Sequence, residues 1–253
     1  MQRLNLMWIY RRVDLKKDVR DLKYISFIGA GGKTSLIKYL ASNLAGIGKR
    51  VAITTTTKIY AEEPYILLEQ KGLGFKNKNP IFIGKSLKEG KLTALNEDEI
   101  KDIARDFDVI LIEADGAKRK PLKYPAPHEP VIPGVTEKVF VLAGLDALYR
   151  KVKDIVFRWQ IFSHDTGISS DEFVTPEMFI SLFSSKGLLK GTEGKIFSVL
   201  LNKFDLCVER NMAFHIAKHL IRRLKPDGVF VASIDYNMFY KIDALKQCVF
   251  NFS

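Results

Sequence analysis

The sequence is poor in the residues that build disulfide scaffolds and zinc sites. Its 253 residues include only two cysteines, Cys207 and Cys248, and four histidines. Both cysteines lie in apolar stretches, and their spacing is not that of a metal-ligand pair. We therefore expect two reduced thiols, as is usual in cytosolic proteins, and no cysteine-based metal site.

Long apolar runs are also absent, although 47% of the residues are hydrophobic. No stretch approaches the roughly 18 apolar residues of a transmembrane helix. The first segment, MQRLNLMWIYRR, has a short apolar patch that Asn5 interrupts, and it has no small-residue cleavage site. We do not expect a signal peptide, and we predict a cytoplasmic protein without membrane association.

Acidic residues are scarce relative to basic ones. The chain carries 40 Lys and Arg against 29 Asp and Glu, a formal net charge of +11. A solvated basic surface of this kind attracts anions, such as nucleotides, phosphorylated cofactors, nucleic acid or an acidic protein. No nucleic-acid-binding motif with interleaved aromatic residues accompanies the basic clusters, so DNA or RNA is not the expected partner. The clusters lie at residues 16–23, 118–123 and 222–225.

Short apolar runs alternate with helical patterns along the chain. Most of the runs are apolar throughout, as expected for strands covered on both faces in a parallel sheet. The pattern predicts a doubly wound α/β fold, with a mainly parallel sheet. The expected strands are 24–28, 51–54, 81–83, 109–113, 139–142, 196–201 and 229–232, and the expected helices are 34–45, 97–106, one starting at Thr175-Pro176, and 208–224.

We expect one domain over residues 1–253, because no repeat or low-complexity linker divides the chain. Residues 118–136 are rich in proline and predict a long loop at the carboxyl edge of the sheet. Residues 144–192 fit helices less regularly, and they are predicted to form a cap or an inserted subdomain.

The segment FIGAGGKTS joins an expected strand to an expected helix. Gly29, Gly31 and Gly32 precede Lys33, Thr34 and Ser35, whereas the full pattern GxxxxGK[ST] would need glycine at Phe27. Glycines let backbone N–H groups face phosphate oxygens, while Lys adds charge and Thr ligates Mg²⁺. Mur-type ligases use a similarly compact loop, so the segment predicts a P-loop; the alternative is a glycine turn before a helix.

The segment DVILIEADGAK places Glu113 and Asp115 at the end of the expected strand 109–113. Carboxylates at that edge, beside a P-loop, hold Mg²⁺ directly or through water. Asp115-Gly116 could also position a loop that senses the γ-phosphate. An ordinary acidic pair at a strand end is the alternative.

The segment LLNKFD follows another apolar strand and matches the Asn-Lys-x-Asp pattern with which many GTPases bind guanine. In that interpretation Asp205 accepts hydrogen bonds from guanine, and Asn202 and Lys203 brace the loop and the base. A plain strand–helix turn is the alternative.

Two further segments follow strands of the expected sheet. In TTTTK, residues 54–58, a hydroxyl of Thr56 or Thr57 is predicted to ligate Mg²⁺ or contact phosphate, although threonine is also a common strand residue. The loop over residues 113–133 concentrates charge at the catalytic edge and predicts a site for an anionic second ligand. Its candidate residues are Lys118, Arg119, His128 and Glu129, of which His128 alone would be unremarkable as a solvated residue.

The ordered set GAGGKTSLI, VAITTTTKI, LIEADGAKRKPLKYPAPHEPVIP, LAGLDAL and LLNKFD resembles the YqeC family of selenium-dependent molybdenum hydroxylase accessory proteins. The resemblance runs from about residue 24 to residue 232. It implies a P-loop nucleoside triphosphatase type of fold and a role in maturing a selenium-containing molybdenum cofactor. It also implies a molybdopterin-type cofactor or a molybdenum hydroxylase as partner. Of the expected His-Arg-Pro-Glu-like segment, residues 157–160 keep only Arg158.

The favoured hypothesis is an Mg²⁺-dependent NTPase that binds GTP or ATP. Lys33 would bind the β- and γ-phosphates, Thr34 would ligate Mg²⁺, and Asp115 or Glu113 would complete the metal shell. One alternative is an ATP-dependent ligase or kinase acting on an anionic second substrate. Another is a nucleotide-gated cofactor chaperone without significant turnover. All three hypotheses need the same phosphate loop.

Overall fold

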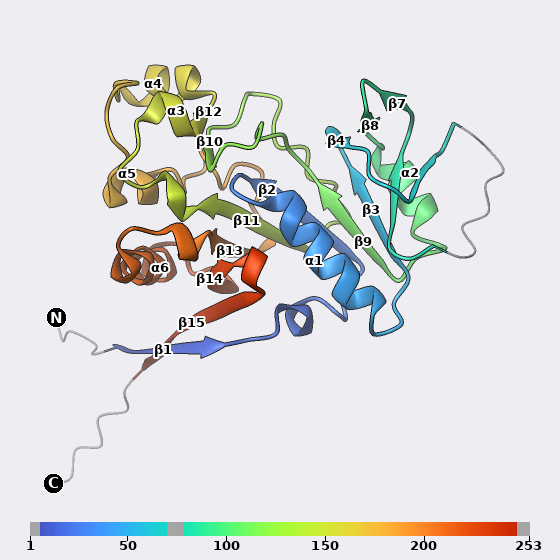
Figure 1. The fold of residues 1–253 in the computed structure, drawn as a ribbon, viewed down its shortest axis with the longest axis horizontal. Coiled ribbons are helices and arrows are strands. Elements are labelled where there is room, and N and C mark those ends of the chain that lie inside the picture. The colour runs from blue at the N-terminus through green and yellow to red at the C-terminus, as the bar shows by residue number, and fades with distance from the viewer. Residues whose placement is uncertain (1–5, 70–77, 247–253) are drawn as a thin grey trace, which may run out of the picture.

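The computed structural model describes residues 6–69 and 78–246 and consists of a large twisted sheet with helices packed on it (Figure 1). Ten strands form the sheet, and the eight from β14 to β5 run parallel. The strands, in spatial order, are β1 (Leu6–Arg12), β15 (Met238–Lys246), β14 (Gly228–Ser233), β13 (Ile196–Asn202), β11 (Lys138–Gly144), β2 (Tyr24–Gly29), β9 (Val109–Glu113), β3 (Val51–Thr55), β6 (Ile81–Gly84) and β5 (Tyr65–Leu67).

Two small sheets lie beyond the carboxyl edge of the large one. The first contains β4 (Lys58–Tyr60), β8 (Lys91–Thr93) and β7 (Leu87–Lys88), and the second pairs β10 (Leu122–Lys123) with β12 (Val156–Phe157). The helices are α1 (Lys33–Ala45), α2 (Glu97–Ile103), α3 (Val152–Ile155), α4 (Trp159–Thr166), α5 (Pro176–Ser181) and α6 (Arg210–Leu224). Short 3₁₀ turns are η1 (Leu15–Asp18), η2 (Leu145–Ala147), η3 (Phe204–Leu206) and η4 (Ile234–Tyr236).

Helices cover both faces of the sheet. Because side chains alternate along each strand, one strand contributes residues to the apolar clusters on both faces. In β11, Val139 and Val141 belong to the apolar cluster that includes residues of α5 and α6. Phe140 and Leu142 belong to the opposite cluster, which contains the buried stripe of α1. Figure 1 shows α1 lying across the front of the sheet. The expectation of an α/β fold with a mainly parallel sheet is confirmed.

All seven expected strands are present, most with ends extended by one to three residues. The N-cap at Asn96 is a full capping box with Glu99, and Thr175 caps α5, which begins at Pro176. Three helix ends differ from the prediction, and the first is that α1 begins at Lys33 instead of residue 34. Residues 104–106 form a turn, because Arg105 and Asp106 donate to carbonyls three residues back, and α6 starts at Arg210 instead of 208.

Residues 144–192 form short helices and turns that pack into the same apolar cluster as β11 and β13. The loop over 118–136 is interrupted only by β10 within the described ranges. No helix among the described residues is long and apolar enough to cross a membrane.

Candidate functional site

The carboxyl ends of five parallel strands bring the predicted site residues to one edge of the sheet. β2 lies between β11 and β9, and β3 lies beyond β9. Backbone register places Phe27 and Thr55 opposite Glu113, and Gly29 opposite Leu142. The glycine loop therefore leaves the sheet directly beside the acidic end of β9.

The glycine loop is tied to its surroundings at its start and open at its end. The N–H groups of Gly29, Ala30 and Gly31 donate to Asp115 Oδ2, Leu142 O and Lys120 O at 2.9, 2.9 and 3.1 Å. Gly32 then caps α1 without a side-chain hydrogen bond. The first N–H groups of a helix have no intrahelical acceptor, so those at the start of α1 can bind an anion.

Lys33 is buried and surrounded by acceptors. Its Nζ donates to Gly29 O at 2.6 Å and lies 3.0 Å from Asp115 Oδ1 and 3.9 Å from Glu113 Oε1. Burial lowers the pKa of Lys33, but the two carboxylates outweigh it and raise the pKa above its ordinary value. Lys33 is therefore a charged group at the glycine loop, and a phosphate would compete with carboxylates for it.

Thr34 and Glu113 form the pair that best fits a divalent cation. Thr34 Oγ1 donates to Glu113 Oε2 at 3.0 Å. Two adjacent oxygens in an Mg²⁺ octahedron with bonds of 2.0–2.1 Å lie about 2.9 Å apart, so this pair already has the required separation. Burial raises the pKa of Glu113, partly offset by Lys33 and Thr34. A bound cation would favour the ionised carboxylate.

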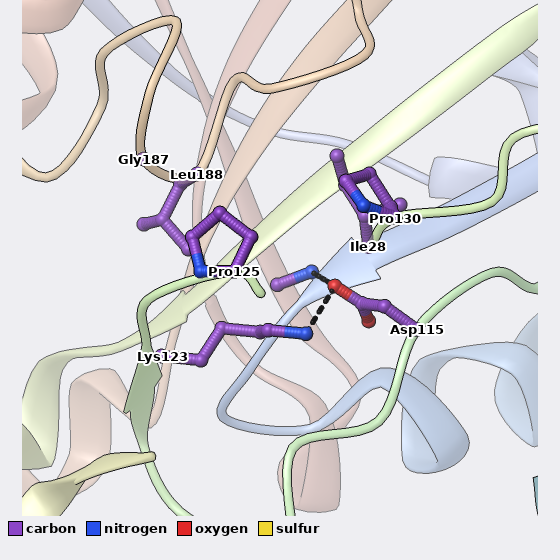
Figure 2. A pocket seen from close by; sticks show the side chains of 8 residues that line it. Ile28, Asp115, Lys123, Pro125, Pro130, Gly187 and Leu188 are labelled. Carbon is purple, nitrogen blue, oxygen red and sulfur yellow. Dashed lines mark hydrogen bonds and ion pairs between the residues drawn. The ribbon is translucent and has the colours of Figure 1, made fainter. Parts of the chain in front are cut away.

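Asp115 lies behind the loop and not in the cleft. It is 2% exposed, and its Oδ2 accepts from Gly29 N and from Lys123 Nζ, both at 2.9 Å (Figure 2). With Lys33 against Oδ1, all of its strong contacts are to the protein. In this structure Asp115 holds the loop, and Glu113 is the carboxylate exposed to the cleft.

Lys123 continues a buried chain of alternating charges away from the loop. Its Nζ also contacts Glu129 Oε2 at 2.8 Å and Gly116 O at 2.7 Å. Glu129 in turn accepts two hydrogen bonds from Arg158, at 2.5 and 3.0 Å. Apolar side chains close over Asp115 and Lys123, and Figure 2 shows them as Ile28, Pro125, Pro130 and Leu188. The charges are thus removed from water and depend on each other.

Both halves of the predicted site share one cleft of about 1090 Å³. Of the residues that the structure describes, eight Lys and Arg side chains and three Glu side chains line it, so the cleft suits an anion. Its lining includes residues of the glycine loop, the start of α1 and the ends of β3 and β9, namely Gly31, Gly32, Lys33, Thr34, Ser35, Thr56 and Glu113. It also includes Lys58, Tyr60, Glu62, Lys91, Lys118, Arg119, Lys120, His128, Glu129, Phe157, Arg158 and Lys203, among others.

The residues predicted for a second ligand all line this cleft. Lys118, Arg119 and His128 are exposed, whereas Glu129 is buried and paired with Lys123 and Arg158. Thr56 also lines the cleft, but its hydroxyl donates to Val131 O at 2.6 Å. Among the described residues, no group of three or more His, Cys, Asp and Glu side chains is arranged to hold a metal ion.

The Asn-Lys-x-Asp segment meets the glycine loop through its first residue. Asn202 Nδ2 donates to Gly31 O at 2.8 Å, and its Oδ1 accepts from Ile234 N at 3.2 Å. Lys203 lines the cleft and pairs with Asp146 at 2.8 Å. The lining of the cleft, over the described chain, does not include Asp205. Asn202 therefore braces the loop, and recognition of a base by Asp205 stays a prediction.

Sequence reasoning did not assign site roles to Lys123, Arg158, Tyr60 or Phe157. The sequence did offer a signal for two of them. Lys123 lies in the charged loop, and Arg158 is the residue of segment 157–160 that matches the expected His-Arg-Pro-Glu-like segment. The two rings carried none, because an isolated aromatic residue after a strand is more often part of a core.

The pairing of Glu129 with Arg158 and Lys123 predicts that the stability of the fold depends on pH. Burial raises the pKa of Glu129, but hydrogen bonds from Arg158 and Lys123 outweigh burial and hold the pKa at about 2, below the ordinary 4.5. A depressed pKa stabilises the fold above pH 4.5, and that stability is lost as pH falls toward 2. We expect a loss of about 2 kcal/mol, less than the full shift implies because water near Arg158 screens the pair.

Urea unfolding of the wild-type protein and Glu129→Gln between pH 5 and pH 2.5 measures this contribution. The wild-type free energy of unfolding should fall more steeply, since only it protonates Glu129. Parallel curves for the two proteins would contradict the assignment.

Comparisons with known proteins agree with the resemblance seen in the sequence. A family model described as YqeC protein matches residues 25–160, which include the glycine loop, Glu113, Asp115 and the charged loop. The match stops before Asn202. A relative from Escherichia coli (strain K12), described as "Uncharacterized protein YqeC", is 33% identical over 202 residues, covering 72% of this chain and 77% of the relative. No solved structure matches the chain.

Proposed function

The chain belongs to the YqeC family, and from that membership and the site we propose an Mg²⁺-dependent nucleotide-binding protein of the P-loop nucleoside triphosphatase type. The proposed activity is NTP hydrolysis in an accessory role, in the maturation of a selenium-containing molybdenum cofactor or hydroxylase. The accessory role rests on the resemblance in the sequence, and the nucleotide site rests on geometry.

One observation carries the nucleotide site: the open end of the glycine loop, Lys33 and the Thr34–Glu113 pair converge at one end of a cationic cleft. A phosphate loop needs N–H donors at a helix start, a lysine and oxygens for Mg²⁺. Lys33 and Thr34 begin α1, directly after the glycine loop that follows β2, and Glu113 ends the neighbouring strand β9. The shortened pattern at Phe27 is compatible with them, because Phe27 is a buried strand residue and the loop starts at Gly29.

We assign the roles as follows. Lys33 and the first N–H groups of α1 bind the phosphates, and Thr34 with Glu113 holds Mg²⁺. Thr56, which lines the same cleft, is a further candidate contact for either. Asp115 positions the loop through Gly29 and Lys33, which refines the sequence hypothesis that it is a metal ligand. Bound Mg²⁺ would supply charge neutralisation at the β- and γ-phosphates.

The direct test is binding of GTP and ATP with and without Mg²⁺. Wild-type protein should bind one of them in an Mg²⁺-dependent manner, and Lys33→Ala should weaken binding by about 10- to 100-fold, the value of a charge-assisted hydrogen bond. Lys101→Ala is the matched control, since Lys101 is an exposed helix residue paired with Glu97. Thr34→Ala should reduce the Mg²⁺ dependence specifically. No binding to wild type, or equal binding to Lys33→Ala, would refute the proposal.

The same titrations decide the base. If Asp205 recognises guanine, the wild-type protein prefers GTP to ATP, and Asp205→Asn removes that preference without weakening phosphate binding. Equal affinities for GTP and ATP would mean that residues 202–205 support the glycine loop and do not recognise the base.

A second candidate is favoured by one observation: the charged loop lines the same cleft as the glycine loop. A ligase or kinase would use this arrangement to transfer phosphate to an anionic second substrate. Phosphate release that requires a second substrate would distinguish it from an NTPase. Tight binding without turnover would instead support a nucleotide-gated carrier.

A further inference from the structure

We propose that the part of the cleft between Tyr60 and Phe157 binds an anionic ligand that carries a planar aromatic ring. The inference rests on the proposed function in one respect, since it gives the second ligand of that site a chemical class. Its evidence is the arrangement of two rings and four cations.

Both rings line the cleft. Tyr60 ends β4 and is 53% exposed, which is high for a large aromatic residue. Phe157 ends β12 on the other side of the charged loop and is half-buried. Partly exposed aromatic rings in a concave site are typical platforms for stacking a planar ligand.

Each ring carries two cations. Lys91 Nζ lies 4.8 Å and Arg119 Cζ 5.3 Å from the centre of the Tyr60 ring. Lys118 Nζ lies 5.5 Å and Arg158 Cζ 4.7 Å from the centre of the Phe157 ring. Consecutive residues of one turn, Lys118 and Arg119, thus reach two different rings, and the turn lies between them.

Among the described residues, three of the four cations on the rings lack a carboxylate partner, and the fourth, Arg158, pairs with Glu129. Within the described ranges, Lys58, Lys91, Lys118 and Arg119 form no ion pair with Asp or Glu, in contrast to Lys33, Lys123 and Arg158. Positive charge gathered in a cleft without counter-charge attracts an anion. Together with the rings, it fits a ligand that combines an anionic group with a flat π-system.

The turn is held in an uncommon backbone conformation. Lys118 and Arg119 have φ values of +43° and +59°, a region that few non-glycine residues adopt. Lys120 N donates to Ala117 O, and Lys120 O accepts from Gly31 N of the glycine loop. Such strained residues cluster at ligand sites. The part of the cleft between the two rings therefore has a fixed position relative to the glycine loop.

The ligand is distinct from the base of the nucleotide. The segment predicted to meet that base follows β13, on one side of β2, whereas Tyr60 follows β3 on the opposite side, beyond β9. In the order of the strands, the loop after β2 therefore lies between the position predicted for the base and the position of Tyr60.

Flavin mononucleotide is a suitable probe, because it joins a planar ring to one phosphate and its fluorescence is quenched by stacking. We expect saturable quenching by the protein. Riboflavin and inorganic phosphate should each bind more weakly than flavin mononucleotide, by about 10-fold or more. Tyr60→Leu and Phe157→Leu should each weaken the probe by about 10-fold, the effect of one stacking contact. Arg119→Ala should weaken flavin mononucleotide but not riboflavin. Phe173→Leu is the matched control, since Phe173 is 56% exposed and outside the cleft.

Lys33→Ala separates this inference from the proposed function. It should weaken nucleotide binding by about 10- to 100-fold and leave the probe bound, because the contacts of Lys33 are to Gly29, Asp115 and Glu113. Probe binding by a protein that binds no nucleotide would support the ring site alone. Three outcomes would overturn the inference: no quenching, equal quenching in all variants, or loss of the probe in Lys33→Ala with competition by GTP or ATP. Tighter binding of a thymidine oligonucleotide, released by the same ring substitutions, would overturn the small-ligand assignment.

Discussion

Replacing Lys123 with methionine is expected to lower the free energy of unfolding by about 3–5 kcal/mol, the cost of leaving a buried charge without its partner. Lys123 is 1% exposed, and its ammonium is shared by Asp115 and Glu129. Methionine keeps the length of the side chain but leaves both carboxylates short of a cation. Asp115 would keep Lys33 and Gly29, whereas Glu129 would keep only Arg158.

Chemical denaturation at neutral pH measures this loss, with Lys85→Met as the matched control. Lys85 also pairs with a carboxylate, Glu99 at 2.9 Å, but its side chain is 46% exposed. An exposed pair contributes at most about 1 kcal/mol, so Lys85→Met should change little. Similar losses in the two variants would mean that burial does not set the strength of the Lys123 network.

A second large effect is expected for Gly31→Ala, with a loss of about 2–4 kcal/mol in unfolding free energy. Gly31 has φ +79°, which costs an L-residue about 1–2 kcal/mol. A Cβ atom there would also lie 2.4 Å from Gly144 N and 2.7 Å from Gly144 Cα, both backbone atoms of a buried strand end. The loop would have to move away from β11, so the start of α1 would lose its position for phosphate.

Gly48→Ala is the control that separates backbone strain from the clash. Gly48 has a similar φ of +85°, but nothing lies within 4 Å of its Cβ position. Its replacement should cost about 1 kcal/mol and leave nucleotide binding intact. Equal stability losses for the two variants, or undiminished nucleotide binding by Gly31→Ala, would contradict the close approach of the loop to β11.

Lys123 and Gly31 belong to one connected set of contacts around the glycine loop. Lys123 fixes Asp115, Asp115 fixes Gly29 and Lys33, and Gly31 is fixed by Lys120 O and Asn202. The glycine loop is therefore positioned from both sides by the charged loop and by β13. Nucleotide affinity in Lys123→Met should fall with stability for this reason.

The sequence by itself determined the parallel core. Most of the seven predicted strands are continuous apolar runs, and short runs of this kind are typical of strands covered on both faces of a parallel sheet. Helix starts at Asn96 and Thr175 were equally predictable, because capping depends on residues within four positions. The glycine loop, Lys33 and Thr34 followed from local spacing alone, since a strand, a loop and a helix in sequence fix their own order in space.

Only the tertiary structure decided the remaining features, because they depend on residues far apart in the chain. β1 pairs with β15 across more than 200 residues, and the sequence of neither segment indicates which strand it pairs with. The division of labour between Glu113 and Asp115 depends on Lys123, whose ammonium reaches Asp115 only after the charged loop folds back over it. Tyr60 and Phe157 become a pair of ligand platforms only because one turn, at Lys118 and Arg119, lies between them.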